Sequence, residues 1–197
     1  MKQRSSKTSG CGERRRDSKP GLQEKGAQLV EFAFILPFVL VFVIGITEFG
    51  RGYNIYHNVT NGAREGARLS TIPENNQPSQ VPDNIRNRVV NYMNSLGLQT
   101  SYYTGAATKN PSGTTVTTYV YGSYPNGAYL LINQAEKIPK LDSSGNPISL
   151  AYYIGSKVTL TYPYTFPLFR GVINLMLSTT AYNGTMYIKN TAVIEND

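Results

Sequence analysis

The chain has 197 residues, which is enough for one domain of ordinary size and some accessory segments. Its net charge is +7, but residues 1–26 contain eight Lys/Arg and three acids and so hold +5 of that charge. The +2 left for residues 27–197 is too little for a basic groove that neutralises a phosphate backbone, so we expect no nucleic-acid partner.

Residues 1–26 form a basic leader. Met1 and Leu22 are its only large apolar residues, so it cannot bury a core, and we expect a disordered cytoplasmic segment. Cys11 is the only cysteine of the chain, which excludes an intrachain disulfide and the metal sites that need paired cysteines. The residues before Cys11 also lack the apolar run of a lipid-attachment signal.

An apolar segment follows the leader. Residues 32–47 carry no charge, and Gln28 and Glu31 are the only strongly polar residues of 27–47. About 20 helical residues cross a hydrocarbon core of about 30 Å, so we predict a single transmembrane helix over 27–49. The basic flank keeps the N-terminus in the cytoplasm, which places the rest of the chain outside. A cleaved secretory signal is disfavoured because no small-x-small site follows the apolar run.

Residues 50–72 continue the helix beyond the membrane. Apolar and small residues recur there every three to four positions, as on one face of a helix. Gly62, Ala63, Gly66 and Ala67 are small enough for another backbone to come close. Two interpretations remain open at this point, namely packing within the chain and contact between copies of it.

Residues 73–197 are predicted to form an extracytoplasmic α+β domain. A turn-rich linker precedes a helix at 83–97, which has apolar residues at helical spacing and ends at a glycine. Five segments rich in Thr, Val, Ile and Tyr predict strands: 114–122, 128–134, 156–166, 174–182 and 185–194. Turn signals separate them at 124–127, 142–147, 166–171 and 182–184. A helix packed on an antiparallel sheet would bury both apolar faces.

Candidate catalytic groups are scarce. His57 is the only histidine, so any Ser-His-acid arrangement would need it, at a position just outside the membrane. The alternative for His57 is a polar residue on the wet face of the helix. The acids from Glu48 to Asp142 show no paired spacing, and no phosphate-binding loop occurs, so we expect no enzyme, no metal and no cofactor. The fifteen tyrosines could line a carbohydrate groove, although tyrosines in strands usually pack the sheet.

The start of the apolar segment places an acid close to a glycine. If the chain is cut between Gly26 and Ala27, the new ammonium lies at the start of a helix, with Glu31 one turn further on the same face. A carboxylate near a helix start is favourable by about 0.3–1 kcal/mol when exposed. The ammonium of a neighbouring subunit could pair with Glu31 and set the stagger between packed helices.

Five short elements mark residues 25–68. They are a glycine after the basic leader, VEF and LP in the apolar helix, EFGR at its end and AREGAR beyond it, at residues 26, 30–32, 36–37, 48–51 and 63–68. This segment resembles the TadE-like family of the tight-adherence (Flp) pilus system. The resemblance implies a pseudopilin that a prepilin peptidase cuts between Gly26 and Ala27, with Glu31 as the recognition acid and Phe32 as the aromatic residue after it.

The leading hypothesis is therefore a non-enzymatic, TadE-like minor pseudopilin with a pilin-like outer domain. Its partners would be the membrane, the prepilin peptidase, and other pilins or pseudopilins that pack against its helix. The main alternative is an uncleaved, single-pass anchor that carries an extracytoplasmic binding module. A membrane-tethered hydrolase is a third hypothesis, and it depends on His57.

Overall fold

The protein is described from a computed structural model, in which residues 22–77, 80–109, 118–177 and 184–196 are placed. The chain divides into two compact units, residues 1–43 and 44–197. Helix α1 (Leu22–Ser70) has 49 residues, includes Pro37, and contributes to both units.

Helix α1 begins earlier than the sequence predicts. We expected the helix to start at Ala27, but residues 22–26 of the predicted leader are helical. The reason is local, because Leu, Gln, Glu and Lys, which occupy positions 22–25, all have high helix propensity. The rest of the predicted leader lies outside the described residues. Among the described helices, one is long and apolar enough to cross a membrane, namely α1 from Gly26, whose most apolar stretch has a mean hydropathy of 2.7.

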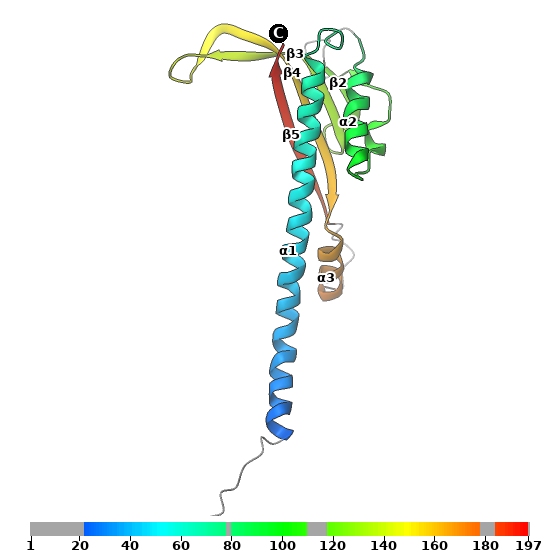
Figure 1. Ribbon diagram of the computed structural model, residues 1–197, viewed down its shortest axis with the longest axis vertical. Coiled ribbons are helices and arrows are strands. Elements are labelled where there is room, and N and C mark those ends of the chain that lie inside the picture. The colour runs from blue at the N-terminus through cyan, green and yellow to red at the C-terminus, as the bar shows by residue number, and fades with distance from the viewer. Residues whose placement is uncertain (1–21, 78–79, 110–117, 178–183, 197) are drawn as a thin grey trace, which may run out of the picture. The chain divides into compact units, whose positions relative to one another are not determined.

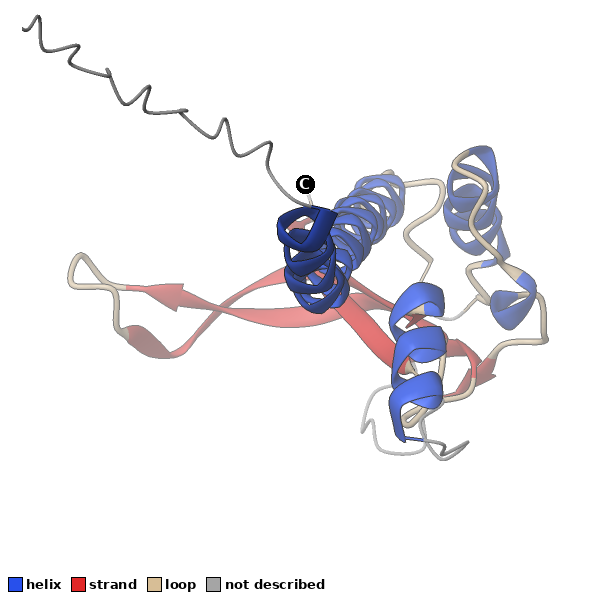
Figure 2. Cartoon of the chain, turned by 90° about the horizontal axis from the view of Figure 1, so that it is seen from below, coloured by secondary structure: helices blue, strands red, loops and turns tan. Residues whose placement is uncertain are grey.

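The outer unit has the predicted α+β fold (Figure 1). After α1 come helix α2 (Asp83–Ser95) and the short 3-10 helix η1 (Ser101–Tyr103). The strands are β1 (Thr108–Lys109), β2 (Thr118–Gly122), β3 (Tyr129–Leu141), β4 (Pro147–Thr165) and β5 (Thr185–Glu195). They pair antiparallel in chain order, so the sheet is a meander. Figure 2 shows α2 and the far part of α1 on the same side of this sheet.

One face of the sheet packs on the two helices to form the core. Leu130 and Ile132 of β3 and Val158 and Leu160 of β4 share this face, as residues two apart in a strand do, and all are fully buried. The helices contribute residues at four-residue spacing, which places them on one helix face: Val59, Ala63 and Ala67 from α1, and Ile85, Val89 and Met93 from α2.

One predicted strand and one predicted turn are wrong. Residues 174–177 of the expected strand, and the expected turn at 166–171, lie almost entirely in helix α3 (Pro167–Leu177). Proline has the φ angle that the first helical position needs, and Leu and Met are good helix formers, so the segment starts and continues as a helix. Residues 178–182 of the predicted strand lie outside the described residues.

The other predicted helices and strands are confirmed with changed lengths, while residues 182–183 of the predicted turn at 182–184 lie outside the described residues. Helix α2 matches the predicted helix at 83–97, and β5 matches the strand at 185–194. Strands β3 and β4 extend to the turn at 142–147 and form the long hairpin drawn in yellow in Figure 1. Strand β2 begins at Thr118, and residues 114–117 lie outside the described part of the chain. The sequence does not predict β1, which is too short to carry a periodic signal.

Candidate functional site

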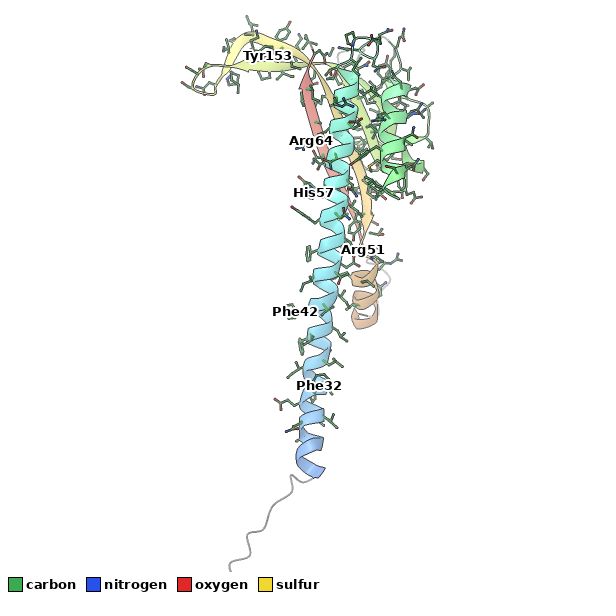
Figure 3. The ribbon with its side chains drawn as sticks, viewed as in Figure 1. Phe32, Phe42, Arg51, His57, Arg64 and Tyr153 are labelled. Carbon is green, nitrogen blue, oxygen red and sulfur yellow. The ribbon has the colours of Figure 1, made fainter. Side chains whose placement is uncertain are left out.

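The predicted processing residues lie near the start of α1 and are exposed: Gly26, Ala27, Glu31 and Phe32. Phe32 keeps 60% of its surface exposed, and its position on the helix is labelled in Figure 3. Glu31 makes no hydrogen bond or ion pair with any residue that the structure describes. The acid and the aromatic ring are therefore both accessible to another molecule.

The bond between Gly26 and Ala27 lies in helical backbone. A peptidase cleft binds its substrate extended, so a peptidase that cut here would first have to open the helix at this bond. Glycine favours opening, because it destabilises a helix by about 1 kcal/mol relative to alanine. A Cβ at Gly26 would meet no described residue within 4 Å, so packing against the described part of the chain does not require glycine here. Two reasons for a glycine at position 26 are left, namely local opening of the helix and access by a partner molecule.

The predicted helix-packing residues are all buried in the core of the outer unit: Gly62, Ala63, Gly66 and Ala67. A Cβ at Gly66 would lie 2.8 Å from Val89 Cγ2 and 3.2 Å from Val158 Cγ1. A Cβ at Gly62 would lie 3.2 Å from Leu160 Cδ2. The small residues thus let α2 and β4 approach α1, which is packing within the chain.

Adding a methyl group at Gly66 is expected to destabilise the outer unit. In Gly66→Ala, overpacking against Val89 and Val158 costs about 1–3 kcal/mol, while replacing a helical glycine gains about 1 kcal/mol. In the matched control Gly50→Ala, nothing lies within 4 Å of the new Cβ, so only the gain remains. Denaturant unfolding in detergent micelles measures both variants, and a Gly66→Ala protein as stable as Gly50→Ala would contradict the packing argument.

The AREGAR element carries an ion-pair group that links α1 to α2. Glu65 accepts hydrogen bonds from Arg68 Nε at 3.3 Å and from Arg88 Nε at 2.8 Å. The hydrogen bonds from Arg68 and then from Arg88 hold the pKa of Glu65 below its ordinary value. Surface pairs of this kind contribute about 1 kcal/mol or less. Their main effect is to fix how α2 lies along α1.

Sequence reasoning missed the role of Glu48, the acid of the EFGR element. Glu48 is completely buried, and its carboxylate accepts hydrogen bonds from the Tyr164 hydroxyl at 3.1 Å and the Leu168 N–H at 2.6 Å. Leu168 lies in the first turn of α3, so Glu48 caps that helix from α1, where a negative charge opposes the helix dipole. Burial, and then the hydrogen bond to Glu48, raise the pKa of Tyr164 above its ordinary value. The available signal was an acid directly after sixteen uncharged residues, which calls for a partner.

A cavity of about 1010 Å³ opens in the outer unit beside Arg51. Figure 3 shows Arg51 on the side of α1 that faces the end of β4. Among the described residues that line the cavity, Arg51 is the only charged one, and five are tyrosines: Tyr102, Tyr124, Tyr162, Tyr164 and Tyr187. Aromatic faces with hydroxyl and amide groups suit a polar, uncharged ligand such as a sugar.

His57 lies outside this cavity, on the exposed surface of α1. The rings of Tyr53 and Tyr56 pack edge-on against it, with centroid distances of 4.4 Å and 5.8 Å. His57 has no hydrogen bond to a described serine or acid. Within the described ranges, no three His, Cys, Asp or Glu side chains gather as a metal site.

Comparison with known proteins places part of this chain in a family. Residues 26–68 match the family model described as TadE-like protein, a range that begins at Gly26 and ends with AREGAR. No curated protein and no solved structure matches the chain. The resemblance seen in the sequence is confirmed: residues 26–68 are a TadE-like segment, and together with the apolar helix they fit a membrane protein related to the Tad pilus.

Proposed function

We propose that the chain is a minor pseudopilin of Flp pilus assembly, which a prepilin peptidase cuts between Gly26 and Ala27. The observation that carries this proposal is the family match, which begins at Gly26 itself. The packing supports it, because Gly26 makes no contact that a side chain would disturb. Glu31 and Phe32 are exposed one turn after the cut and are free for recognition.

Cutting changes what the helix can bind. It creates an ammonium at Ala27 and removes a leader with a net charge of +5. A charged side chain in the middle of a bilayer costs about 2.5–3.5 kcal/mol on insertion scales. Pairing Glu31 with the ammonium of a neighbouring helix lowers this cost, so the processed chain gains an assembly contact that the precursor lacks.

The same proposal assigns pilin contacts to the exposed part of α1. The small residues at 62–67 are buried within the chain, so they offer no surface to another subunit. Large apolar side chains are exposed earlier on the helix, among them Phe34 and Phe42, each 73% exposed. Helix packing through this region in the bacterial inner membrane, with the outer unit outside, is the expected role, and it needs no catalysis by the chain itself.

Mass spectrometry of the mature N-terminus tests the proposal. The full-length sequence is expressed in cells with and without the prepilin peptidase, and the resulting protein is isolated from each. We expect a chain that begins at Ala27 only where the peptidase is present. An intact Met1–Asp197 chain in both kinds of cell would overturn the proposed processing.

A second candidate function is a single-pass anchor that stays uncut and presents a binding module. The tyrosine-lined cavity beside Arg51 is the observation in its favour. An intact chain in both kinds of cell, together with saturable binding of oligosaccharides that Tyr162→Ala weakens, would support this function in place of the first.

A further inference from the structure

Helix α3 has an unusual composition for its place in the fold. Its 11 residues, PLFRGVINLML, include Arg170 and Asn174 as the only polar side chains. A helix that is apolar almost all round normally lies in a protein core or in a membrane. Yet Leu168 keeps 43% of its surface exposed, and Figure 1 shows α3 beyond the end of the sheet. The outer unit therefore does not enclose Leu168, the first large apolar residue of this helix.

The first turn of α3 is attached to α1 at the end of the apolar run. Glu48 accepts the Leu168 N–H at 2.6 Å. One turn earlier on α1, a Cβ at Gly45 would lie 4.0 Å from Phe169 Cε2. Gly45 belongs to the uncharged run that ends at Thr47, and Glu48 is the next residue. The first turn of α3 therefore lies beside the end of the uncharged run of α1.

We propose that α3 is an interfacial helix that lies in the outer leaflet of the membrane beside α1, with the exposed side chain of Leu168 inserted among the lipids. Its 11 residues extend about 16 Å, which is too short for a hydrocarbon core of about 30 Å, so it does not form a second span. Interfacial helices bury their apolar face about 5–10 Å into the boundary between headgroups and acyl chains. Arg170 is exposed and long enough to keep its guanidinium among the headgroups.

The hydrogen bond to Glu48 lowers the free-energy cost of inserting the start of α3. The first N–H groups of a helix have no partner within it, and an unpaired N–H is costly at the edge of the hydrocarbon. Glu48 accepts the N–H of Leu168, so this donor is already satisfied. The hydrogen bond from Leu168 to Glu48 thus holds the start of α3 beside α1 and also lowers the free-energy cost of placing it at the membrane surface.

Lipid suits this surface better than another protein chain. Ile46 and Phe49, on either side of Glu48, are 74% and 71% exposed. Together with Leu168 they add apolar surface that is exposed near the end of the uncharged run of α1. The acyl chains that surround the span also cover this surface, and no further partner is needed. The inference rests on α1 crossing the membrane and not on its processing by a peptidase.

Depth-dependent fluorescence quenching in vesicles tests the inference. The chain has no Trp, so single Trp residues can be followed without background. Full-length Leu168→Trp is reconstituted at a low protein-to-lipid ratio into phospholipid vesicles with or without bromine on the upper part of the acyl chains. Ile46→Trp is the control for a position in the membrane span of α1. Tyr153→Trp, at the residue of the β3–β4 hairpin that Figure 3 labels, is the control for a position in water.

We expect bromine to reduce the emission of Leu168→Trp at least about twofold, as for Ile46→Trp, because an interfacial helix places side chains at the depth of the quencher. Tyr153→Trp should be unaffected. Val172→Trp repeats the measurement one turn along α3, in case the change at Leu168 alone displaces the first turn. Quenching of Ile46→Trp without quenching of either α3 variant would overturn the inference and leave the span intact. Absence of quenching in all variants would overturn the span itself.

Discussion

Gly26→Val is expected to slow the cutting of the chain in cells that contain the prepilin peptidase. A Cβ at Gly26 meets nothing within 4 Å in the protein itself, so the variant should fold as the parent does. In a cleft shaped for an absent side chain, the added atoms cost about 1–3 kcal/mol. Since each 1.4 kcal/mol or so is a tenfold change in rate, cutting should slow roughly tenfold to a hundredfold. The accumulation of precursor and mature chain over time measures this loss.

The matched control for this change is Gly21→Val, the same substitution outside the proposed cleavage site. It should be cut at the normal rate and should yield a chain that begins at Ala27. Equal cutting of Gly26→Val and Gly21→Val would show that the peptidase does not read this glycine. Slow cutting of both would point to a general effect of valine on the segment, and would also contradict the assignment.

Glu48→Ala is expected to cause the largest loss of stability in the outer unit. It leaves the buried Tyr164 hydroxyl and the Leu168 N–H without their acceptor. Each unsatisfied buried group costs about 1–3 kcal/mol, so the combined loss is roughly 2–6 kcal/mol. For a unit of this size, the melting temperature should fall by roughly 4–24 °C. Thermal unfolding in detergent micelles, followed by the near-ultraviolet circular dichroism of the tyrosines, measures the shift.

Two further variants distinguish the effect of losing these hydrogen bonds from the effect of losing a charge. Glu74→Ala removes an exposed acid and should change stability by no more than about 0.5 kcal/mol. Glu48→Gln retains one oxygen acceptor but turns an amide N–H₂ toward the existing donors, so its stability should lie between those of the parent and Glu48→Ala. If Glu48→Ala melted at the temperature of Glu74→Ala, the capping role of Glu48 would be refuted.

The AREGAR and EFGR elements illustrate how far sequence reasoning reaches for the candidate site. The resemblance located both elements, and the match over residues 26–68 agrees with it. It assigned no partner to Glu48, because the groups that bind Glu48 come from residues 164 and 168, more than a hundred positions away. The small residues at 62–67 left two interpretations open, and only the neighbours Val89 and Val158 show which surface they serve.

The sequence by itself determined the long apolar helix, the α2 segment, the last strand and the α+β class, because these depend on periodicity and composition within short windows. It placed a turn where α3 begins and a strand where α3 ends, since the helix signals there are a proline and a few residues that also suit strands. Only the tertiary structure decided that Glu48 caps α3, that the glycines of α1 admit α2 and β4, and that tyrosines from several elements line one cavity. The physical reason is that hydrogen bonds and close packing join residues distant in the chain, whose separation carries no local pattern.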